Sequence, residues 1–471
     1  MRRPGVRNAA LIAAGVVLYA CTDGDEGGGI TTPVRCDLPV IGSRTLEANP
    51  RNVLAAAFRA HVQGADSGRV RHRPTASAGD SLTPAVAVAG DSVEVPVLGL
   101  LPGTDYTMSL TVYGRCGVIT APPITLTTGA LPADLPAYSA EGSDPSPGYV
   151  SFAAGSYGLV IDNTGRVVWY HRFDNGAGLN FQPQPNGRYV ARPPSPDPNA
   201  PWVELDVLGR VTRTLSCARG FAPRFHDLII DPDGSYWVMC DEIREMDLSA
   251  AGGPALARVS GTGVQHLGPA GEVLFAWSPF DHFEVSGWDP PMPGQANVNW
   301  THGNAIALDA DGNLLISFRN LSEIAKIDAR TGDVLWRLGG VHNEFTFVEQ
   351  TSPLFARQHG VRLDARGELV FLDNLGDATG SRTLRYALDE GARTARLLAV
   401  YRPDQSVVAQ VGGTTQPLPP DRTLVSYGSG GRVEEYDGAG RVVWRIAGNP
   451  GYIFRAQRVR SLYAPGAAAA R

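Results

Sequence analysis

The sequence contains the stretch Leu159-Val-Ile-Asp-Asn-Thr-Gly-Arg-Val-Val-Trp169, in which an apolar strand, a turn with Asp and Gly, and a second strand ending in an aromatic follow one another. Turn residues between two β-rich runs are typical of a β-hairpin. The same pattern returns five more times, so internal repetition is the strongest signal in the chain. The further copies lie at residues 203–209, 264–277, 324–336, 384–389 and 433–444.

A second type of hairpin, with an acidic-glycine turn between apolar strands, lies between these copies. It occurs at residues 182–190, 228–239, 305–317, 361–372 and 416–426. Two alternating hairpins make a four-stranded unit, and about 50 residues per unit suit the blade of a propeller. The sequence therefore predicts an all-β protein in which residues 148–465 form a six-bladed β-propeller. A solenoid or a sandwich of sheets is the alternative, and the short strands with regular turn signals disfavour it.

The chain ahead of the repeats is separated from them by a Pro/Gly-rich linker, residues 131–147. Within residues 36–130, the stretch Leu101-Pro-Gly-Thr-Asp-Tyr106 followed by an alternating strand resembles the "leucine, proline-glycine-threonine, x, tyrosine" corner of fibronectin type III domains. We therefore expect residues 36–130 to form a small fibronectin type III-like β-sandwich.

The N-terminus carries the features of an export signal. Residues 1–20 combine three arginines with an apolar run too short to cross a membrane, and no later segment is long enough either. Leu18-Tyr-Ala-Cys21 resembles the bacterial lipobox, which implies acylation of Cys21 and a flexible tether over residues 21–35. We expect an exported protein that meets the membrane of the cell envelope only through this lipid anchor. Ordinary secretion with cleavage after Ala20 is the alternative.

The remaining cysteines form two groups, Cys36 with Cys116 and Cys217 with Cys240, and an exported chain favours two local disulfide bonds. The formal net charge is −6, and removal of the three arginines of residues 1–20 makes it −9. This acidic balance leaves no basic surface for nucleic acid, so no nucleic-acid partner is expected.

Two acidic turns, residues 231–234 and 309–312, resemble calcium loops at first sight. Their glycine stands at the fourth position rather than the sixth that an EF-hand requires, and no helices flank them. We therefore predict hairpin turns here, with glycine supplying the positive φ.

Three of the nine histidines occupy one equivalent place in successive units. His226, His302 and His359 each stand just before the first strand of a hairpin of the second type. Positions that repeat once per blade lie at the same radius of a propeller, so these side chains are expected to converge on its centre. Taken singly, each could be a satisfied contact between blades, and the other six histidines are interpreted as structural.

At this point a family resemblance becomes close. The blocks that carry it are Arg224-Phe-His-Asp-Leu228, the stretch from Trp300-Thr-His-Gly-Asn304 to Arg319-Asn320, residues 327–340, Phe355-Ala-Arg-Gln-His-Gly360 and Phe371-Leu-Asp-Asn374. They resemble the arylsulfotransferase family, whose propeller enzymes move a sulfuryl group from an aryl sulfate to a phenolic acceptor without a nucleotide donor. The resemblance implies no cofactor and no metal.

The resemblance also implies roles for individual residues. His359 would be the nucleophile that becomes sulfated, and His226, His302 and Arg319 would hold the sulfuryl oxygens. Asn304 would be a secondary donor to the substrate. Gly303 and Ala305 depart from the expected pattern around this asparagine, where a bulkier residue and a serine are usual.

Sulfuryl transfer requires these residue types whatever the family of the protein. A neutral imidazole is a competent nucleophile near pH 7, and an arginine fork stabilises negative oxygens in a water-poor channel. Two other functions stay open. Three histidines can bind zinc in a metal-dependent hydrolase, although Arg319 would be repelled by the metal. A non-catalytic propeller could also use the pocket to capture an anion or a glycan.

Overall fold

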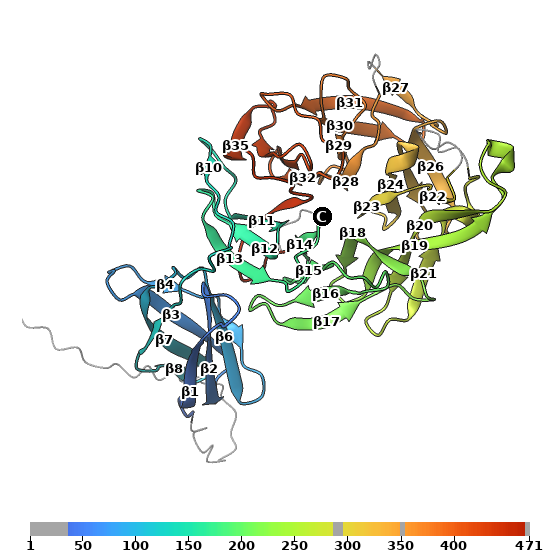
Figure 1. Ribbon diagram of the computed structural model, residues 1–471. Coiled ribbons are helices and arrows are strands. Elements are labelled where there is room, and N and C mark those ends of the chain that lie inside the picture. The colour runs from blue at the N-terminus through green and yellow to red at the C-terminus, as the bar shows by residue number, and fades with distance from the viewer. Residues whose placement is uncertain (1–35, 286–294, 349–353, 467–471) are drawn as a thin grey trace, which may run out of the picture. The chain divides into compact units, whose positions relative to one another are not determined.

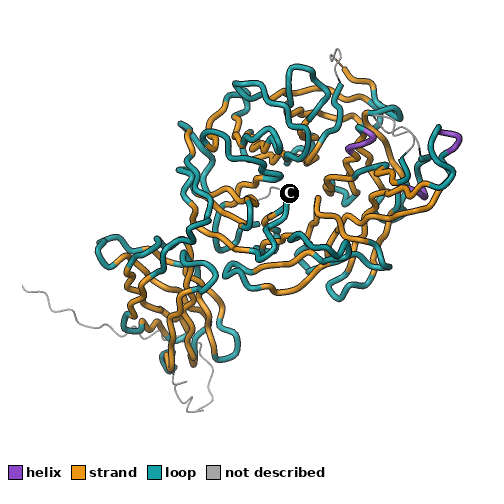
Figure 2. The backbone as a smooth tube through the Cα atoms, viewed as in Figure 1, coloured by secondary structure: helices purple, strands orange, loops and turns teal. Residues whose placement is uncertain are grey.

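The computed structural model describes residues 36–285, 295–348 and 354–466. Over these ranges the regular structure consists of β-strands and three short 3-10 turns (Figure 2), so the predicted all-β class is confirmed. The signal peptide predicted at residues 1–20, the lipidation site Cys21 and the tether at 21–35 lie outside the described residues. No helix within the described ranges combines the length and hydrophobicity of a membrane span. The turns are η1 (Ser249–Ala251), η2 (Pro279–Asp281) and η3 (Arg319–Leu321).

The first part of the described chain forms two antiparallel sheets around a shared aliphatic core. One sheet has the order β1-β2-β6, and the other has the order β4-β3-β7-β8 with β5 and β9 at its sides. The backbone N–H of Leu101 donates a hydrogen bond of 2.9 Å to the hydroxyl of Tyr106, which is the contact of a tyrosine corner. The strands are β1 (Val40–Ala48), β2 (Ala55–Gln63), β3 (Ser67–Pro74), β4 (Ser81–Leu82), β5 (Val86–Ala87), β6 (Ser92–Leu98), β7 (Asp105–Gly114), β8 (Gly117–Thr120) and β9 (Ile124–Thr127).

The described chain from Ala140 onward forms six sheets, which Figure 1 shows placed around a common centre. The first sheet comprises β11 (Tyr149–Ala154), β12 (Tyr157–Ile161), β13 (Val167–Arg172) and β36 (Ala456–Val459). The second comprises β14 (Phe181–Pro183), β15 (Tyr189–Ala191), β16 (Trp202–Leu205) and β17 (Val211–Leu215). The third comprises β18 (Ala222–Ile230), β19 (Tyr236–Met246), β20 (Ala257–Leu267), β21 (Val273–Trp277) and β22 (Asn297–Asn299).

The other three sheets follow along the chain. The fourth comprises β23 (Gly303–Leu308), β24 (Leu314–Phe318), β25 (Glu323–Ile327) and β26 (Val334–Gly339). The fifth comprises β27 (Thr346–Val348), β28 (His359–Leu363), β29 (Leu369–Asp373), β30 (Arg382–Asp389) and β31 (Thr394–Tyr401). The sixth comprises β32 (Thr414–Leu418), β33 (Arg422–Ser426), β34 (Val433–Tyr436), β35 (Val442–Ile446) and β10 (Ala140–Glu141).

The two hairpin types of the sequence occupy different radii. Hairpins of the second type, such as β23–β24, supply strands near the centre, whereas hairpins of the first type, such as β25–β26, supply strands farther out (Figure 1). Neighbouring sheets pack face to face. Trp336 and Ile324 of one sheet, for example, share a buried cluster with Phe371 and Tyr386 of the next. Apolar residues on both faces of a strand are thereby buried.

Both ends of this part of the chain add strands to sheets built by distant segments. The late strand β36 pairs with β11, with Tyr149 opposite Val459, and takes the innermost place of that sheet. The early strand β10 pairs with the edge of β35. The pairing of β36 with β11 explains why the sequence contains six outer hairpins but only five inner ones, because the sixth inner pair comes from the two ends of this region. Strand β10 lies inside the segment expected to be a linker, where it pairs with unpaired backbone groups of β35.

The two acidic turns close hairpins. Gly234 and Gly312 have φ values of 90° and 81°, a region that favours glycine. The carboxylate of Asp309 accepts the backbone N–H groups of Asp311 and Asn313 at 2.9 and 2.8 Å. The aspartate therefore completes the turn in the manner usual for this residue.

The disulfide predicted between Cys217 and Cys240 is present, and it joins residues 23 apart in the sequence. Cys240 lies on β19 opposite Pro223 of β18, so the bond joins the chain that follows β17 to the strand that pairs with the one carrying His226. Cys36 and Cys116 are disulfide-bonded as well, and their pairing with each other stays a prediction.

Removal of this bond should lower stability. In a chain with both Cys217→Ser and Cys240→Ser, the free energy of unfolding is expected to fall by about 3 kcal/mol, because a loop of this size no longer restricts the unfolded chain. Urea denaturation of the oxidised wild type and the double variant measures the difference. Equal midpoints would contradict a stabilising role for the bond.

Candidate functional site

Three histidines lie together at the centre of the ring of sheets. His226 belongs to β18, His302 directly precedes β23, and His359 is the first residue of β28. The ring centroids of His226 and His302 are 5.0 Å apart, and those of His226 and His359 are 5.8 Å apart. The three side chains therefore converge although they are far apart in the sequence.

A local irregularity accompanies each histidine. The ladder between β18 and β19 shifts between Pro223 and Leu228, and corresponding shifts lie at the starts of β23 and β28. Bulges redirect side chains away from the regular alternation of a strand. His302 has a φ of 48° and Arg357 a φ of 56°, a region costly for residues other than glycine. Backbone strain of this kind gathers at functional sites.

Arg319 and Asn304 lie beside the histidines. The backbone N–H of Arg319 donates to the carbonyl of His302 at 3.1 Å, so the two ends of the β23–β24 hairpin meet at the site. The guanidinium of Arg319 donates to neutral oxygens, the amide of Asn320 at 3.2 Å and the carbonyl of Gln410 at 2.9 Å. Asn304 is buried, and its amide donates to the carbonyl of Gln358 at 2.7 Å, next to His359.

Hydrogen bonds to Nδ1 distinguish one histidine from the other two. Nδ1 of His359 lies 2.7 Å from the carbonyl oxygen of Gly413. A carbonyl only accepts, so this nitrogen carries the proton, and Nε2 of the neutral ring has a lone pair. Nδ1 of His226 instead accepts from Nε of Arg224 at 3.2 Å, and the amide of Asn299 lies 2.7 Å from Nδ1 of His302. With that amide nitrogen as donor, both rings carry their proton on Nε2.

The surroundings keep the three rings neutral. Burial lowers the pKa of His359 to about 3, against the raising effect of its bond to Gly413. Burial also lowers the pKa of His226 and of His302 well below the usual range, and the positive charge of Arg224 adds to the effect at both. Burial and the nearby Arg357 lower the pKa of Arg319 to about 10, so this side chain stays charged at neutral pH.

These shifts predict a pH dependence of stability. The pKa of His359 falls on folding, so its contribution is complete above pH 6.5 and is lost as the pH falls from 6.5 toward 3. Wild type should lose about 1.4 kcal/mol per pH unit more than His359→Asn over this window, because the unfolded histidine gains a proton. Urea denaturation of both chains at pH 7 and pH 5 measures the difference, and parallel losses would contradict it.

Aromatic rings form part of the wall of the site. Phe225 stacks on His226 at 4.1 Å between centroids, and Phe454 meets His226 at 5.7 Å and His359 at 5.1 Å. Such rings exclude water and strengthen the electrostatic interactions of the groups they enclose.

Sequence reasoning missed several residues of the site. Arg224 and Arg357 each precede a histidine by two positions, so their shared spacing could have found them. Arg455 directly precedes β36, and it would have been found if that strand had been predicted as an inner one. Phe454 and Asn299 carry no signal that separates them from ordinary core and loop residues.

The other histidines have partners elsewhere in the fold. In the propeller region, His266 and His282 stack on Trp237 and Trp277, and His342 bonds to Glu323. Within the described ranges, no group of three or more His, Cys, Asp or Glu side chains is arranged to hold a metal ion.

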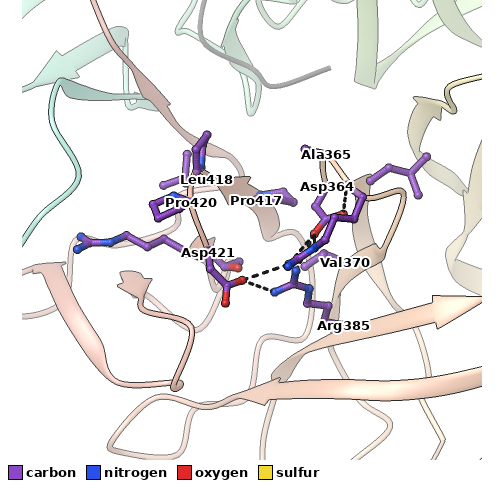
Figure 3. Close-up of a pocket in the computed structure, with 13 residues that line it drawn as sticks. Asp364, Ala365, Val370, Arg385, Pro417, Leu418, Pro420 and Asp421 are labelled. Atoms are coloured by element: carbon purple, nitrogen blue, oxygen red, sulfur yellow. Dashed lines mark hydrogen bonds and ion pairs between the residues drawn. The ribbon is translucent and has the colours of Figure 1, made fainter.

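A cavity of about 140 Å³ lies at a distance from the histidines. It is lined by residues of the turns that follow β28 and β32, whereas His359 stands at the start of β28. Figure 3 shows Asp364 and Asp421 turned toward Arg385, and their oxygens lie 2.7 Å from its guanidinium nitrogens. These three charged side chains therefore pair with one another in the wall of the cavity.

The fold and the site define an all-β protein of propeller-like architecture with histidines and arginines gathered at its centre. Residues 220–449 match the family model of the arylsulfotransferases (ASST). Over these residues, just under half of the chain, the protein is similar to the arylsulfotransferases. No protein of curated function matches it.

Solved structures with a similar course of the chain include three bacterial proteins. A protein of unknown function from Bacteroides caccae has 16% identity and a TM-score of 0.43, covering 67% of this chain and 100% of its own. A catalytically inactive virginiamycin B lyase from Staphylococcus aureus with quinupristin has 10% identity and a TM-score of 0.36, covering 65% and 87%. The PQQ-bound aldose sugar dehydrogenase from Streptomyces coelicolor has 15% identity and a TM-score of 0.37, covering 66% and 96%.

Proposed function

We propose that this protein is a nucleotide-independent sulfotransferase that moves a sulfuryl group from an aryl sulfate to a phenolic acceptor through a sulfated His359. The match of residues 220–449 to the arylsulfotransferase model supports arylsulfotransferase activity in general. The observation that carries the finer proposal is the hydrogen bond from Nδ1 of His359 to the carbonyl of Gly413. It leaves the Nε2 lone pair of a neutral, buried imidazole as the nucleophile.

The first half of the cycle sulfates the enzyme. Nε2 of His359 attacks sulfur, a nitrogen–sulfur bond forms, and the bond from sulfur to the aryl oxygen breaks. The electron pair leaves with the donor as a phenolate, which takes a proton from water. In the second half the acceptor hydroxyl attacks sulfur and loses its proton to water, and the nitrogen–sulfur electron pair returns to Nε2.

The neighbouring side chains hold the group in transfer. His226 and His302 present Nε2–H groups, and Arg319 presents a charged guanidinium. Donors fixed in a water-poor site stabilise the charge on the sulfuryl oxygens without reorganising during the reaction. We assign Asn304 mainly to positioning, because one of its N–H groups holds the carbonyl of Gln358 next to the nucleophile.

The wider proposal concerns the rest of the chain. Residues 148–465 are taken as a six-bladed propeller, completed by β36 and β10, and residues 36–130 as a fibronectin type III-like module. The protein is exported and held to the cell envelope through acylated Cys21. The substrates are small aryl sulfates and phenols, and the mechanism uses no cofactor.

One assay tests this function against its rivals. The purified chain is incubated with a chromogenic aryl sulfate, with and without a phenol acceptor and a metal chelator. Release of the chromophore that depends on acceptor and resists the chelator is expected. Loss of activity with the chelator would favour a metal-dependent hydrolase. Binding of the donor without turnover would favour a non-catalytic anion or glycan receptor.

Arg319→Lys should slow the reaction without preventing it. A point charge replaces a planar fork, so the transition state should lose about 2 to 4 kcal/mol of stabilisation. Single-turnover measurement of donor cleavage gives the rate. The sulfated enzyme should still form, and an unchanged rate would remove Arg319 from the site.

A further inference from the structure

Arg455 occupies the place in its sheet that His302 occupies in another. It directly precedes β36, the innermost strand of the sheet formed with β11, and His302 directly precedes β23. Its guanidinium Nη2 donates to the carbonyl oxygen of His226 at 2.9 Å. Arg455 is also adjacent in the chain to Phe454, whose ring touches His226 and His359. The side chain therefore belongs to the immediate surroundings of the site.

Arg455 brings a surplus of positive charge. It is 1% exposed, and its Nη2 lies 3.2 Å from a carboxylate oxygen of Asp227, itself 1% exposed. The other carboxylate oxygen of Asp227 lies 3.0 Å from Nη1 of Arg362. One carboxylate thus faces two guanidinium groups, and Arg362 alone would balance it. A net positive charge in a dry interior is costly unless an anion compensates it.

The guanidinium of Arg455 also has an unused donor. Its Nε–H is buried without a hydrogen-bond partner among the described residues. Buried donors of this kind are rare, and one on a charged group carries the largest cost. The pKa of Arg455 falls to about 10 through burial, so the charge persists at neutral pH. Positive charge and a vacant donor beside the histidines are the features of an oxyanion site.

We propose that Arg455 is a further catalytic residue, whose guanidinium binds the sulfuryl oxyanion beside His226 and His359. This inference rests on the proposed function, because it adds Arg455 to Arg319 as a side chain that binds the sulfuryl oxygens. The ion pair with Arg362 leaves the carboxylate of Asp227 satisfied, so Arg455 is not needed for charge balance. The sulfated intermediate and inorganic sulfate both supply the tetrahedral anion that this site would take.

The test compares two buried arginines of the same segment. Arg455→Lys is expected to slow sulfation of the enzyme by an aryl sulfate about 100-fold, because a directional donor is lost from a preorganised site. Arg458→Lys is the matched control. Arg458 is buried as well, but its guanidinium pairs with Glu435 and lies over the ring of Trp444, so its rate should stay near that of wild type.

A binding measurement keeps the proposal testable if Arg455→Lys folds poorly. The full chain with ¹⁵N-labelled arginine is titrated with inorganic sulfate and followed by NMR. The Nε–H signal of Arg455 is the one absent from the spectrum of Arg455→Lys. If that variant yields no spectrum, the signal is assigned in the wild type from its contacts with Phe454. A saturable shift of this signal supports the site. No shift at sulfate concentrations that inhibit turnover overturns it.

The outcomes separate this inference from the function on which it rests. A wild type that neither cleaves the donor nor becomes sulfated defeats the proposed function. A wild type that turns over, with Arg455→Lys as fast as Arg458→Lys, overturns the role of Arg455 alone. A loss confined to Arg455→Lys, seen in the sulfation rate and in inhibition by sulfate, supports it.

Discussion

Replacing His359 with asparagine should abolish sulfuryl transfer. Loss of Nε2 of His359, the proposed nucleophile, is expected to cut donor cleavage by more than about 1000-fold. The asparagine amide can still donate to the carbonyl of Gly413, which His359 contacts at 2.7 Å, so the local fold should survive. The loss would then report chemistry rather than unfolding.

His266→Asn is the matched control for this variant. His266 stacks on Trp237 at 4.2 Å and lies opposite Phe275 in the ladder between β20 and β21, the outer pair of strands. The same substitution there should leave donor cleavage within a few-fold of wild type. Substantial cleavage by His359→Asn would show that another group attacks sulfur or that water does so directly.

The largest effect on stability is expected at Asp227. In Asp227→Asn the guanidinium groups of Arg362 and Arg455 lose their shared counter-charge in a buried setting. Removing one partner of a buried ion pair typically costs about 3 to 5 kcal/mol, because an uncompensated charge remains. The free energy of unfolding should fall by this amount, measured by urea denaturation at neutral pH.

Asp421→Asn gives the contrast. The carboxylate of Asp421 also faces two guanidinium groups, those of Arg385 and Arg366, but its side chain is 47% exposed. Solvent screens such pairs, so less than about 1 kcal/mol should be lost. Equal losses at the two positions would mean that burial does not set the strength of the Asp227 network.

Much of the fold could be predicted because its signals are local. Each outer hairpin combines a turn, β-branched strands and often a closing tryptophan such as Trp336 or Trp444, and these repeat in sequence order. The pairing of β36 with β11 could not be predicted in this way. It joins residues separated by almost the whole repeat region, and nothing in residues 456–459 names a distant partner.

The same distinction between local and long-range features applies to the residues of the site. The histidines stand at one register of successive hairpins, so their convergence follows from the repeat. Their tautomers depend on Arg224, Asn299 and the carbonyl of Gly413, which tertiary structure brings to the rings. Arg455 was missed for the same reason as its strand. Its charge is identified as a surplus only from the ion pairs that Asp227 makes with Arg362 and Arg455.

The most direct test of the central claim is the mass of the enzyme after exposure to an aryl sulfate without acceptor. We expect a burst of phenol release and an added mass of about 80 Da, that of a sulfuryl group, on the peptide that contains His359. Addition of a phenol acceptor should remove that mass. A modified peptide containing His226 or His302 instead, or an unmodified enzyme that still turns over, would show that His359 is not the nucleophile.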